Sequence, residues 1–391
     1  MSTAHPRCPG PESAADPAFL RALDAGAIAA LVQQHLAGAN RVAALVPDYL
    51  RWKEADGSLV GYRAQVQTPG GTVDSYVTVR TAAPQRLAAE VARLAHRAGE
   101  QWGGLSALAL LPDANLLLLA FPIDRAIHDL RKLVQPSKLR SLVMAACPTV
   151  VPAGLRLSKS RSSFRLVRYK PERRAVLQWR LGCVDAAGNT EALPAVWVRC
   201  HAAGSAANAV AAARAASAAG ISCPPTLAVV HDRLTIEGHV EGQSWSPESR
   251  QGHDESLDAA AHTVARLHAC APPRGLPLHG PVQELDRALR AAEDLGRLSA
   301  ALGTTARMLA DRLAAQVPGA GTPGFAHGDL HAGQVLLRAD GAALCDFDRA
   351  AVAPAAFDLA SFHAHCLLAD ALRGHELAAA FVAAYRRHRA L

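Results

Sequence analysis

The segment FAHGDLHAGQVLL, residues 325–337, sets one aspartate between two histidines and then a glutamine, beside apolar runs. ALCDFDRA, residues 343–350, follows with two more aspartates around a phenylalanine. We read the first segment as a loop that leads into a short strand, and the turn ADGA as its link to a second strand, ALCDF. This hairpin predicts that Asp329, Gln334 and Asp346 lie at neighbouring strand ends.

Oxygen-bearing side chains in this arrangement suit phosphoryl transfer. One carboxylate must accept or orient the proton of the substrate hydroxyl, and oxygen donors must hold magnesium against the nucleotide phosphates. Mg²⁺ favours hard oxygen ligands in octahedral geometry and takes only a few of them from protein. Gln334 offers an amide oxygen and Asp346 a carboxylate oxygen. An ordinary polar β-turn is the competing interpretation of the same residues.

The spacing resembles that of protein kinases, which carry H-R-D-x-x-x-x-N and then D-F-G. HGDLHAGQ, CDFD and FDLA, the last at residues 357–360, more closely resemble the motifs of the aminoglycoside phosphotransferase-like kinases, which share the protein-kinase fold. The glutamine at the metal position is similar to that of maltokinases, which carry HGDLHLGQ. Those continue D-F-E-G-E-P, whereas this chain has DFDRAA.

The resemblance implies a role for each motif residue. Asp329 is the implied catalytic base, and Gln334 and Asp346 are the implied magnesium ligands. Asp358 is implied to be a structural carboxylate that holds the loop. His331 either lines the site or bonds a backbone carbonyl within the loop, and we favour the second role. Two further histidines are read as helix-face residues without a metal role, His363 and His365.

Segments upstream resemble the nucleotide-binding parts of the same family. In LTIEGHVEGQSW, the backbone from about Glu237 to Val240 is implied to bond the adenine edge, and Gly242 to allow the following turn. Arg199, in VWVRCHA, stands where kinases place the phosphate-binding lysine, and a guanidinium suits phosphate oxygens through its planar fork. The alternative for Arg199 is a strand residue that snorkels to solvent. Lys170 is a second phosphate-binding candidate, at a turn that lacks the family's glycines.

One expected residue is missing near Arg199. Kinases fix the phosphate-binding residue with a glutamate on the next helix, yet SAANAVAAARAASAAG contains none. The earlier helix PQRLAAEVARLAHRAG has Glu90, after Arg80. Three explanations stay open: Arg199 is oriented another way, phosphate handling is altered, or the earlier unit is the one that docks above the helical lobe. We favour the first, because the segment with Arg199 is contiguous with the hinge-like and catalytic segments.

The order of periodic segments predicts an α+β protein, and the resemblance implies that its fold is bilobal and protein-kinase-like. Its predicted parts are a disordered tail, an N-terminal α+β unit, a β-rich N-lobe with hinge, and a helical catalytic C-lobe, at 1–17, 18–135, 140–245 and 246–391. The two middle parts share their element order, and each third strand ends near an arginine. A diverged duplication of the N-lobe is therefore predicted; a chance likeness of two α+β stretches is the alternative.

Composition limits the classes of partner and compartment. Half of the 391 residues are hydrophobic and 19% are charged, which is typical of globular proteins. The net charge of +7 permits an anionic ligand such as a nucleotide, but no basic run interleaved with aromatics predicts nucleic-acid binding. Eight scattered cysteines without a CxxC pair predict reduced thiols and a cytoplasmic protein. The apolar stretch LSALALLPDANLLLLAFPI is interrupted by Pro112 and Asp113, which favours a β-hairpin over a membrane span.

Together these patterns predict an ATP- and magnesium-dependent phosphotransferase that acts on a hydroxyl of a small metabolite. A sugar is the first choice of acceptor, from the similarity at Gln334. A cationic aminoglycoside is disfavoured, because the helical region expected to line the acceptor pocket, 246–326, has nearly balanced charge and a polycation needs an acidic excess. One alternative is a weak or inactive nucleotide-binding protein, since the helix glutamate and the glycine loop are missing. A protein-directed kinase is the other, and the short span between Asp346 and Asp358 disfavours it. The oligomeric state stays open.

Overall fold

The computed structural model describes residues 17–53, 57–97, 99–202, 206–245, 253–316, 321–370 and 373–390, and almost all of the predicted tail lies outside these ranges. The chain divides into two compact units that do not follow it in order. The first contains the described residues up to 135 together with 169–175 and 285–315, and the second contains 136–168, 176–284 and the described residues from 316 onward. Each unit is α+β, as predicted.

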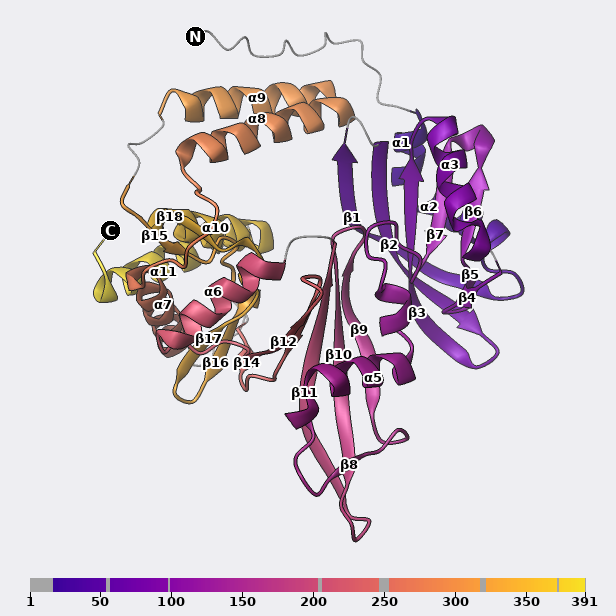
Figure 1. Cartoon of the computed structure of the whole chain (residues 1–391). Helices are drawn as coiled ribbons and strands as arrows, with labels where there is room; N and C mark the ends of the chain where they lie inside the picture. The colour runs from indigo at the N-terminus through magenta and orange to yellow at the C-terminus, as the bar shows by residue number, and fades with distance from the viewer. Residues whose placement is uncertain are drawn as a thin grey trace. The chain divides into compact units, whose positions relative to one another are not determined.

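The first unit is built on an antiparallel five-stranded sheet of order β1-β2-β3-β7-β6 (Figure 1). Its strands are β1 (Arg41–Lys53), β2 (Gly57–Thr68), β3 (Gly71–Thr81), β6 (Leu108–Leu111) and β7 (Leu116–Ala120), with a small β4 (Gln101–Trp102) and β5 (Leu105–Ser106) pair beside them. Its helices are α1 (Pro17–Leu23), α2 (Ala25–His35), α3 (Pro84–Leu94), α4 (Leu130–Leu133), most of α8 (Pro281–Leu298) and α9 (Ala300–Ala314).

Strand β7 shows why an apolar run of this length need not cross a membrane. Its LLLLA residues alternate between the two faces of the sheet, and both faces are covered. Leu116 and Leu118 pack in the cluster that contains residues of α1 and α2, whereas Leu117 and Leu119 pack with Leu87 of α3. A strand buried on both faces reads as continuously hydrophobic. The predicted hairpin is confirmed by the antiparallel pairing of β6 with β7.

The second unit joins a larger sheet to a helical part (Figure 1). Its sheet has the order β12-β13-β11-β10-β8, and β9 also pairs with β10. These strands are β8 (Arg156–Leu157), β9 (Ser163–Lys170), β10 (Arg174–Val184), β11 (Thr190–His201), β12 (Thr226–Val230) and β13 (Leu234–Glu237). Helix α5 (Pro136–Ala146) precedes them, and α6 (Ala206–Ala218) follows β11.

The helical part of the second unit contains the motifs HGDLHAGQ, CDFD and FDLA. It consists of α7 (His253–Ala269), α10 (Ala355–Ala369) and α11 (Gly374–His388) with the short strands β14 (Gln243–Ser244), β15 (Pro323–Ala326), β16 (Val335–Arg338), β17 (Gly341–Leu344) and β18 (Ala351–Pro354). Stacked rings of Trp245, Phe362 and Phe381 form part of its core. Within the described ranges, no helix combines the length and apolar character needed to cross a membrane.

The two sheets repeat one arrangement. The path β1-β2-β3-β7-β6 of the first unit corresponds to β9, β10, β11, β13 and β12 of the second, and a helix follows the third strand in each. Arg80 of β3 is paired with Leu117, the second residue of β7. Arg199 of β11 is paired with Thr235, the second residue of β13. The shared element order seen in the sequence is thus present in space; its origin in a duplication stays a prediction.

Candidate functional site

The loop that begins at His327 is fixed by hydrogen bonds from its backbone to the buried carboxylate of Asp358. The backbone N–H groups of His327 and Gly328 donate to the carboxylate of Asp358, at 2.6 and 2.8 Å. Asp358 is fully buried on α10, and its Oδ2 also lies 3.0 Å from Nε2 of His268 on α7. Burial alone would raise the pKa of Asp358, but His268, His327 and the N–H of Gly328 hold it below its ordinary value. These contacts agree with the structural role predicted for Asp358.

Gly328 brings the loop against the segment that follows β17. Its φ is 83°, and a Cβ at this position would lie 1.8 Å from the carbonyl oxygen of Arg349. Only glycine fits so close an approach with positive φ. The next residue, Asp329, has its Oδ1 3.4 Å from Nη1 of Arg349. Arg349 is half exposed, so this ion pair is weak and leaves Asp329 accessible.

The predicted hairpin brings Gln334 and Asp346 together. Val335 of β16 is paired with Leu344 of β17, and the N–H of Cys345 donates to the carbonyl of Gln334 at 2.9 Å. The side-chain Nε2 of Gln334 donates to Oδ2 of Asp346 at 3.2 Å. Asp346 has a φ of 69°, a left-handed conformation that is uncommon for a residue other than glycine and often found at functional sites.

Arg199 joins this pair from the sheet. Its Nη1 donates to Oδ1 of Asp346 at 3.0 Å, and its Nε donates to Oε2 of Glu237 at 2.9 Å. The side chain is only 13% exposed, so the snorkelling alternative is wrong. Burial alone would lower the pKa of Arg199, but Glu237 and the nearby aspartates raise it above its ordinary value, and the guanidinium is charged.

Glu237 supplies the carboxylate that α6 lacks. Arg199 faces Thr235 across the β11–β13 ladder, and Glu237 is the next residue on the same face of β13. Such diagonal neighbours lie within reach of long side chains. From the sequence only a backbone role in the hinge was predicted for Glu237, and its side-chain role was missed because the sequence does not show the register of strand pairing. The acidic residue ending β13 was the available signal.

The cluster around Arg199 carries more negative than positive charge. Arg199 faces three carboxylates, those of Glu237, Asp346 and Asp348. Burial raises the pKa of Glu237, and Asp348 and Asp346 add to this rise while Arg199 opposes it. A small cavity of about 20 Å³, space for one water molecule, lies against these groups. The excess of carboxylates favours the binding of a further cation.

The donor set fits a magnesium ion bound in part by non-protein oxygens. Across the part of the chain that the structure describes, no three His, Cys, Asp or Glu side chains gather into a metal cluster. Gln334 and Asp346 are held together by their own hydrogen bond and carry oxygen ligands of the kind that Mg²⁺ prefers. Two such protein ligands, completed by phosphate and water oxygens, suffice for Mg²⁺ in nucleotide sites.

The other residues predicted to contact the nucleotide are Val240 and Lys170. Val240 is half-buried after β13, and the N–H of Gly238 in the same segment donates to the carbonyl of Pro225 at 2.8 Å. Gly242 has a φ of 151°, and a Cβ there would meet Leu336 at 2.8 Å, so this turn requires glycine. Lys170 ends β9 within the segment 169–175, which belongs to the first unit, whereas Arg199 belongs to the second.

The histidines near the motif pack against each other. The rings of His331 and His365 lie 4.6 Å apart. Burial, followed by the neighbouring His365, lowers the pKa of His331 to about 4. On α10, His363 Nε2 lies 3.0 Å from Nδ1 of His375. His331 is therefore neutral at physiological pH, and its visible partner is a ring.

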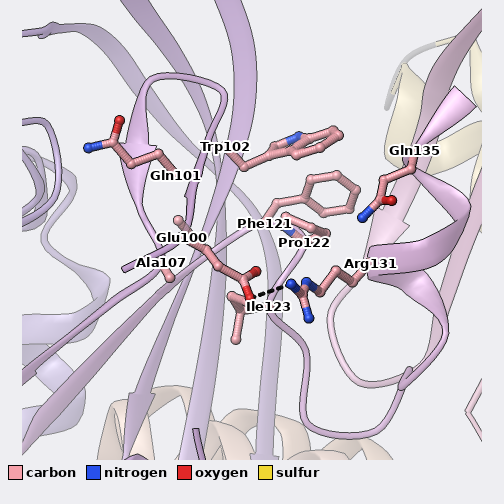
Figure 2. A pocket seen from close by; sticks show the side chains of 10 residues that line it. Glu100, Gln101, Trp102, Ala107, Phe121, Pro122, Ile123, Arg131 and Gln135 are labelled. Atoms are coloured by element: carbon pink, nitrogen blue, oxygen red, sulfur yellow. Dashed lines mark ion pairs between the residues drawn. The ribbon is translucent and has the colours of Figure 1, made fainter. Parts of the chain in front are cut away.

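The first unit has a pocket of its own, which the sequence did not predict. Figure 2 shows Trp102, Phe121 and Pro122 among the residues that line this pocket. Its volume is about 210 Å³. At its edge, Arg131 Nη2 lies 2.7 Å from Oε1 of Glu100. Both members of this ion pair are partly exposed, so the pair adds little stability.

The model of the phosphotransferase enzyme family (APH) matches residues 194–391. A crystal structure of an aminoglycoside-3'-phosphotransferase of type VIII is 21% identical, with 65% of this chain and 92% of that chain covered and a TM-score of 0.44. A choline/ethanolamine kinase family protein from Mesorhizobium loti is 17% identical, with 66% and 78% covered and a TM-score of 0.42. An amicoumacin kinase in complex with AMP-PNP and Ca²⁺ is 13% identical, with 67% and 80% covered and a TM-score of 0.44. No curated protein sequence matches the chain.

Proposed function

The chain belongs to the phosphotransferase enzyme family, and from this premise we propose that it transfers the γ-phosphoryl group of ATP to a hydroxyl of a small metabolite. One observation carries the proposal: Arg199, Gln334 and Asp346 are linked by hydrogen bonds in a single cluster. Phosphoryl transfer asks the protein mainly for positioning and for charge stabilisation. A guanidinium for phosphate and two oxygen ligands for a cation supply both.

Arg199 has donors enough for two tasks. A guanidinium carries five N–H groups in a rigid fork. Glu237 accepts from Nε and so fixes the plane of the group, while Nη1 is directed at Asp346. The same end of the fork suits phosphate oxygens, and Glu237 keeps the side chain in place when the contact with Asp346 is exchanged. Gln334 and Asp346 would hold magnesium, which neutralises phosphate charge when bound.

Asp329 is proposed as the catalytic base. Its partner Arg349 is half exposed and 3.4 Å away, so the carboxylate is open to an incoming hydroxyl. As the hydroxyl oxygen bonds to phosphorus, its proton passes to a carboxylate oxygen of Asp329. The bond between the γ-phosphorus and the bridging oxygen breaks, and ADP leaves with that electron pair.

We propose a sugar or another uncharged hydroxylated metabolite as the acceptor. The glutamine at the metal position supports a sugar, and the nearly balanced charge of residues 246–326 argues against a polycation. The seven described cysteines are free thiols, which supports a reducing compartment such as the cytoplasm.

A screen of hydroxylated metabolites tests the function, with sugars first. The wild-type chain with ATP and Mg²⁺ is expected to release ADP only when an acceptor is present, and mass spectrometry is expected to find one phosphoryl group on that acceptor. Asp329→Asn is expected to abolish both signals. Asp340→Asn, at an exposed turn, is the matched control and should retain full activity. Acceptor-dependent ADP release that survives Asp329→Asn would contradict the proposal.

The alternative function, a nucleotide-binding protein without turnover, has lost one of its two grounds. The helix glutamate is absent, but Glu237 now provides a carboxylate for Arg199. The other ground, the absent glycine loop, still holds. The same screen separates the two functions: nucleotide-induced stabilisation without ADP release from any acceptor would favour the alternative.

A further inference from the structure

Arg80 in the first unit occupies the place that Arg199 occupies in the second. Each lies on the third strand of its sheet, opposite the second residue of the neighbouring strand. Arg80 is nearly fully buried, and its Nε lies 3.2 Å from Oε2 of Glu90 on α3. A basic residue on this strand, fixed by a helix glutamate, is what kinases use to hold nucleotide phosphates. The first unit therefore has the framework of a phosphate site.

A carboxylate from the chain itself occupies that framework. Glu172 belongs to the turn between β9 and β10, within the segment 169–175 of the first unit. Its Oε1 accepts from Nη1 of Arg80 at 2.5 Å, and its two oxygens accept from Arg125 at 3.0 Å each. Arg51 is a third partner. Guanidinium groups bind carboxylate and phosphate oxygens in the same bidentate manner, so Glu172 can stand in for a phosphate.

The backbone of the turn is fitted to this contact. Glu172 has a φ of 55°, an uncommon conformation for a non-glycine residue, and its N–H donates to Oδ2 of Asp124 at 2.8 Å. Such strain persists only where the surroundings hold it. Burial alone would raise the pKa of Glu172, but Arg125, Arg80 and Arg51 hold it below its ordinary value. The carboxylate is therefore charged at neutral pH.

An aromatic ring from the same segment accompanies the carboxylate. The buried Tyr169 ring lies 5.1 Å from Phe121 and 5.5 Å from Tyr76, both edge to face, and its hydroxyl donates to Asp124 at 2.7 Å. Phe121 lies four residues beyond Leu117, as His239 in the hinge-like segment lies four residues beyond Thr235. Tyr169 is thus packed beside the first unit's counterpart of the segment expected to bind adenine.

We propose that the segment Tyr169–Ala175 fills the nucleotide face of the first unit, with Tyr169 in place of a base and Glu172 in place of a phosphate. The first unit then binds no nucleotide. It acts as a clamp that fixes the turn between β9 and β10.

The ion pairs of Glu172 hold the turn in one conformation. The turn Pro171–Arg174 has no glycine, and Glu172 within it binds Arg80 and Arg125. Loss of the Glu172 charge should therefore loosen this turn.

Hydrogen exchange on the full chain without nucleotide tests the clamp alone. Amides of residues 169–175 are expected to exchange slowly in the wild type and at least about tenfold faster in Glu172→Gln. Glu191→Gln, an exposed charge change on β11, is the control and should leave them unchanged. Rapid exchange of this segment in the wild type would overturn the clamp, whatever the enzyme's activity.

A second variant guards against loss of folding. Arg125→Gln removes one partner of Glu172 at a half-exposed site and should leave the chain folded. It is expected to speed the exchange of residues 169–175, but less than Glu172→Gln does. Exchange rates equal to those of the wild type in both variants would overturn the clamp.

Discussion

Two arginines hold the same place in two sheets of this molecule, yet their surroundings carry opposite charge balances. Glu172, beside Arg80, is bound by three guanidinium groups, those of Arg51, Arg80 and Arg125. Arg199 faces three carboxylates, those of Glu237, Asp346 and Asp348. At the first site three cations therefore bind one carboxylate of the chain, whereas at the second three carboxylates surround one cation, an excess of negative charge that a bound cation would balance.

The two glutamates respond to this difference in opposite ways. Burial raises the pKa of both, but three arginines overcome it at Glu172 and one arginine does not at Glu237. The position of a residue on a shared framework therefore does not settle its role; the charges gathered around it do. Variants of these carboxylates measure how far this contrast extends.

The largest effect is expected on turnover. Asp346→Asn removes a proposed cation ligand and an Arg199 partner, and kcat should fall by at least about 10³-fold, close to 4 kcal/mol. Glu90→Gln makes the corresponding change beside Arg80 and should leave kcat within a few-fold. Steady-state kinetics at saturating ATP measure both. Equal losses in the two variants would erase the functional distinction between the clusters.

The free energy of unfolding is expected to fall more for a variant beside Arg80 than for one beside Arg199. Glu172→Gln leaves buried guanidinium groups without their carboxylate, and the free energy of unfolding should fall by about 3 kcal/mol. Glu237→Gln removes one of three crowded carboxylates and keeps a hydrogen-bond acceptor, so it should cost about 1 kcal/mol or less. Urea denaturation followed by circular dichroism compares the two. A larger loss for Glu237→Gln would contradict the charge balance described here.

The pH dependence of these two variants should have opposite signs. The pKa of Glu172 is lowered in the folded chain, so its contribution is present above its ordinary value of 4.5 and is lost as pH falls through the folded pKa. The pKa of Glu237 is raised, so its ionised form costs stability at neutral pH and that cost is relieved as pH falls. On acidification, the stability difference between wild type and Glu172→Gln should therefore shrink. The same difference for Glu237→Gln should move in favour of the wild type; parallel curves would count against both assignments.

The smallest effect is expected at His331. Its pKa is lowered to about 4, chiefly by burial, so the ring is neutral across the range in which enzymes of this class are assayed. His331→Asn should change kcat only slightly and should leave the pH–rate profile between about pH 5 and 8 unshifted. Proton NMR of the ring should show no titration there, and a titration near pH 6.5 would disprove its burial.

The predictable part of the site is the part that is local in sequence. Gln334 and Asp346 are twelve residues apart in one hairpin, so turn signals alone brought them together. The contact between Arg199 and Glu237 depends on strand register, in which a shift of one residue reverses every side chain. Glu172 and Arg80 are separated by 92 residues. Nothing in the sequence of the turn PERR indicates which arginines bind its glutamate, because only the tertiary fold brings them together.

Counting bound nucleotides tests the central claim most directly. Calorimetric titration with Mg²⁺ and a non-hydrolysable ATP analogue is expected to give one site per chain in the wild type. Asp346→Asn should remove that site, and Glu172→Gln should keep a stoichiometry of one. Two sites in the wild type, or a single site that survives Asp346→Asn unchanged, would contradict the assignment of nucleotide binding to the Arg199 cluster.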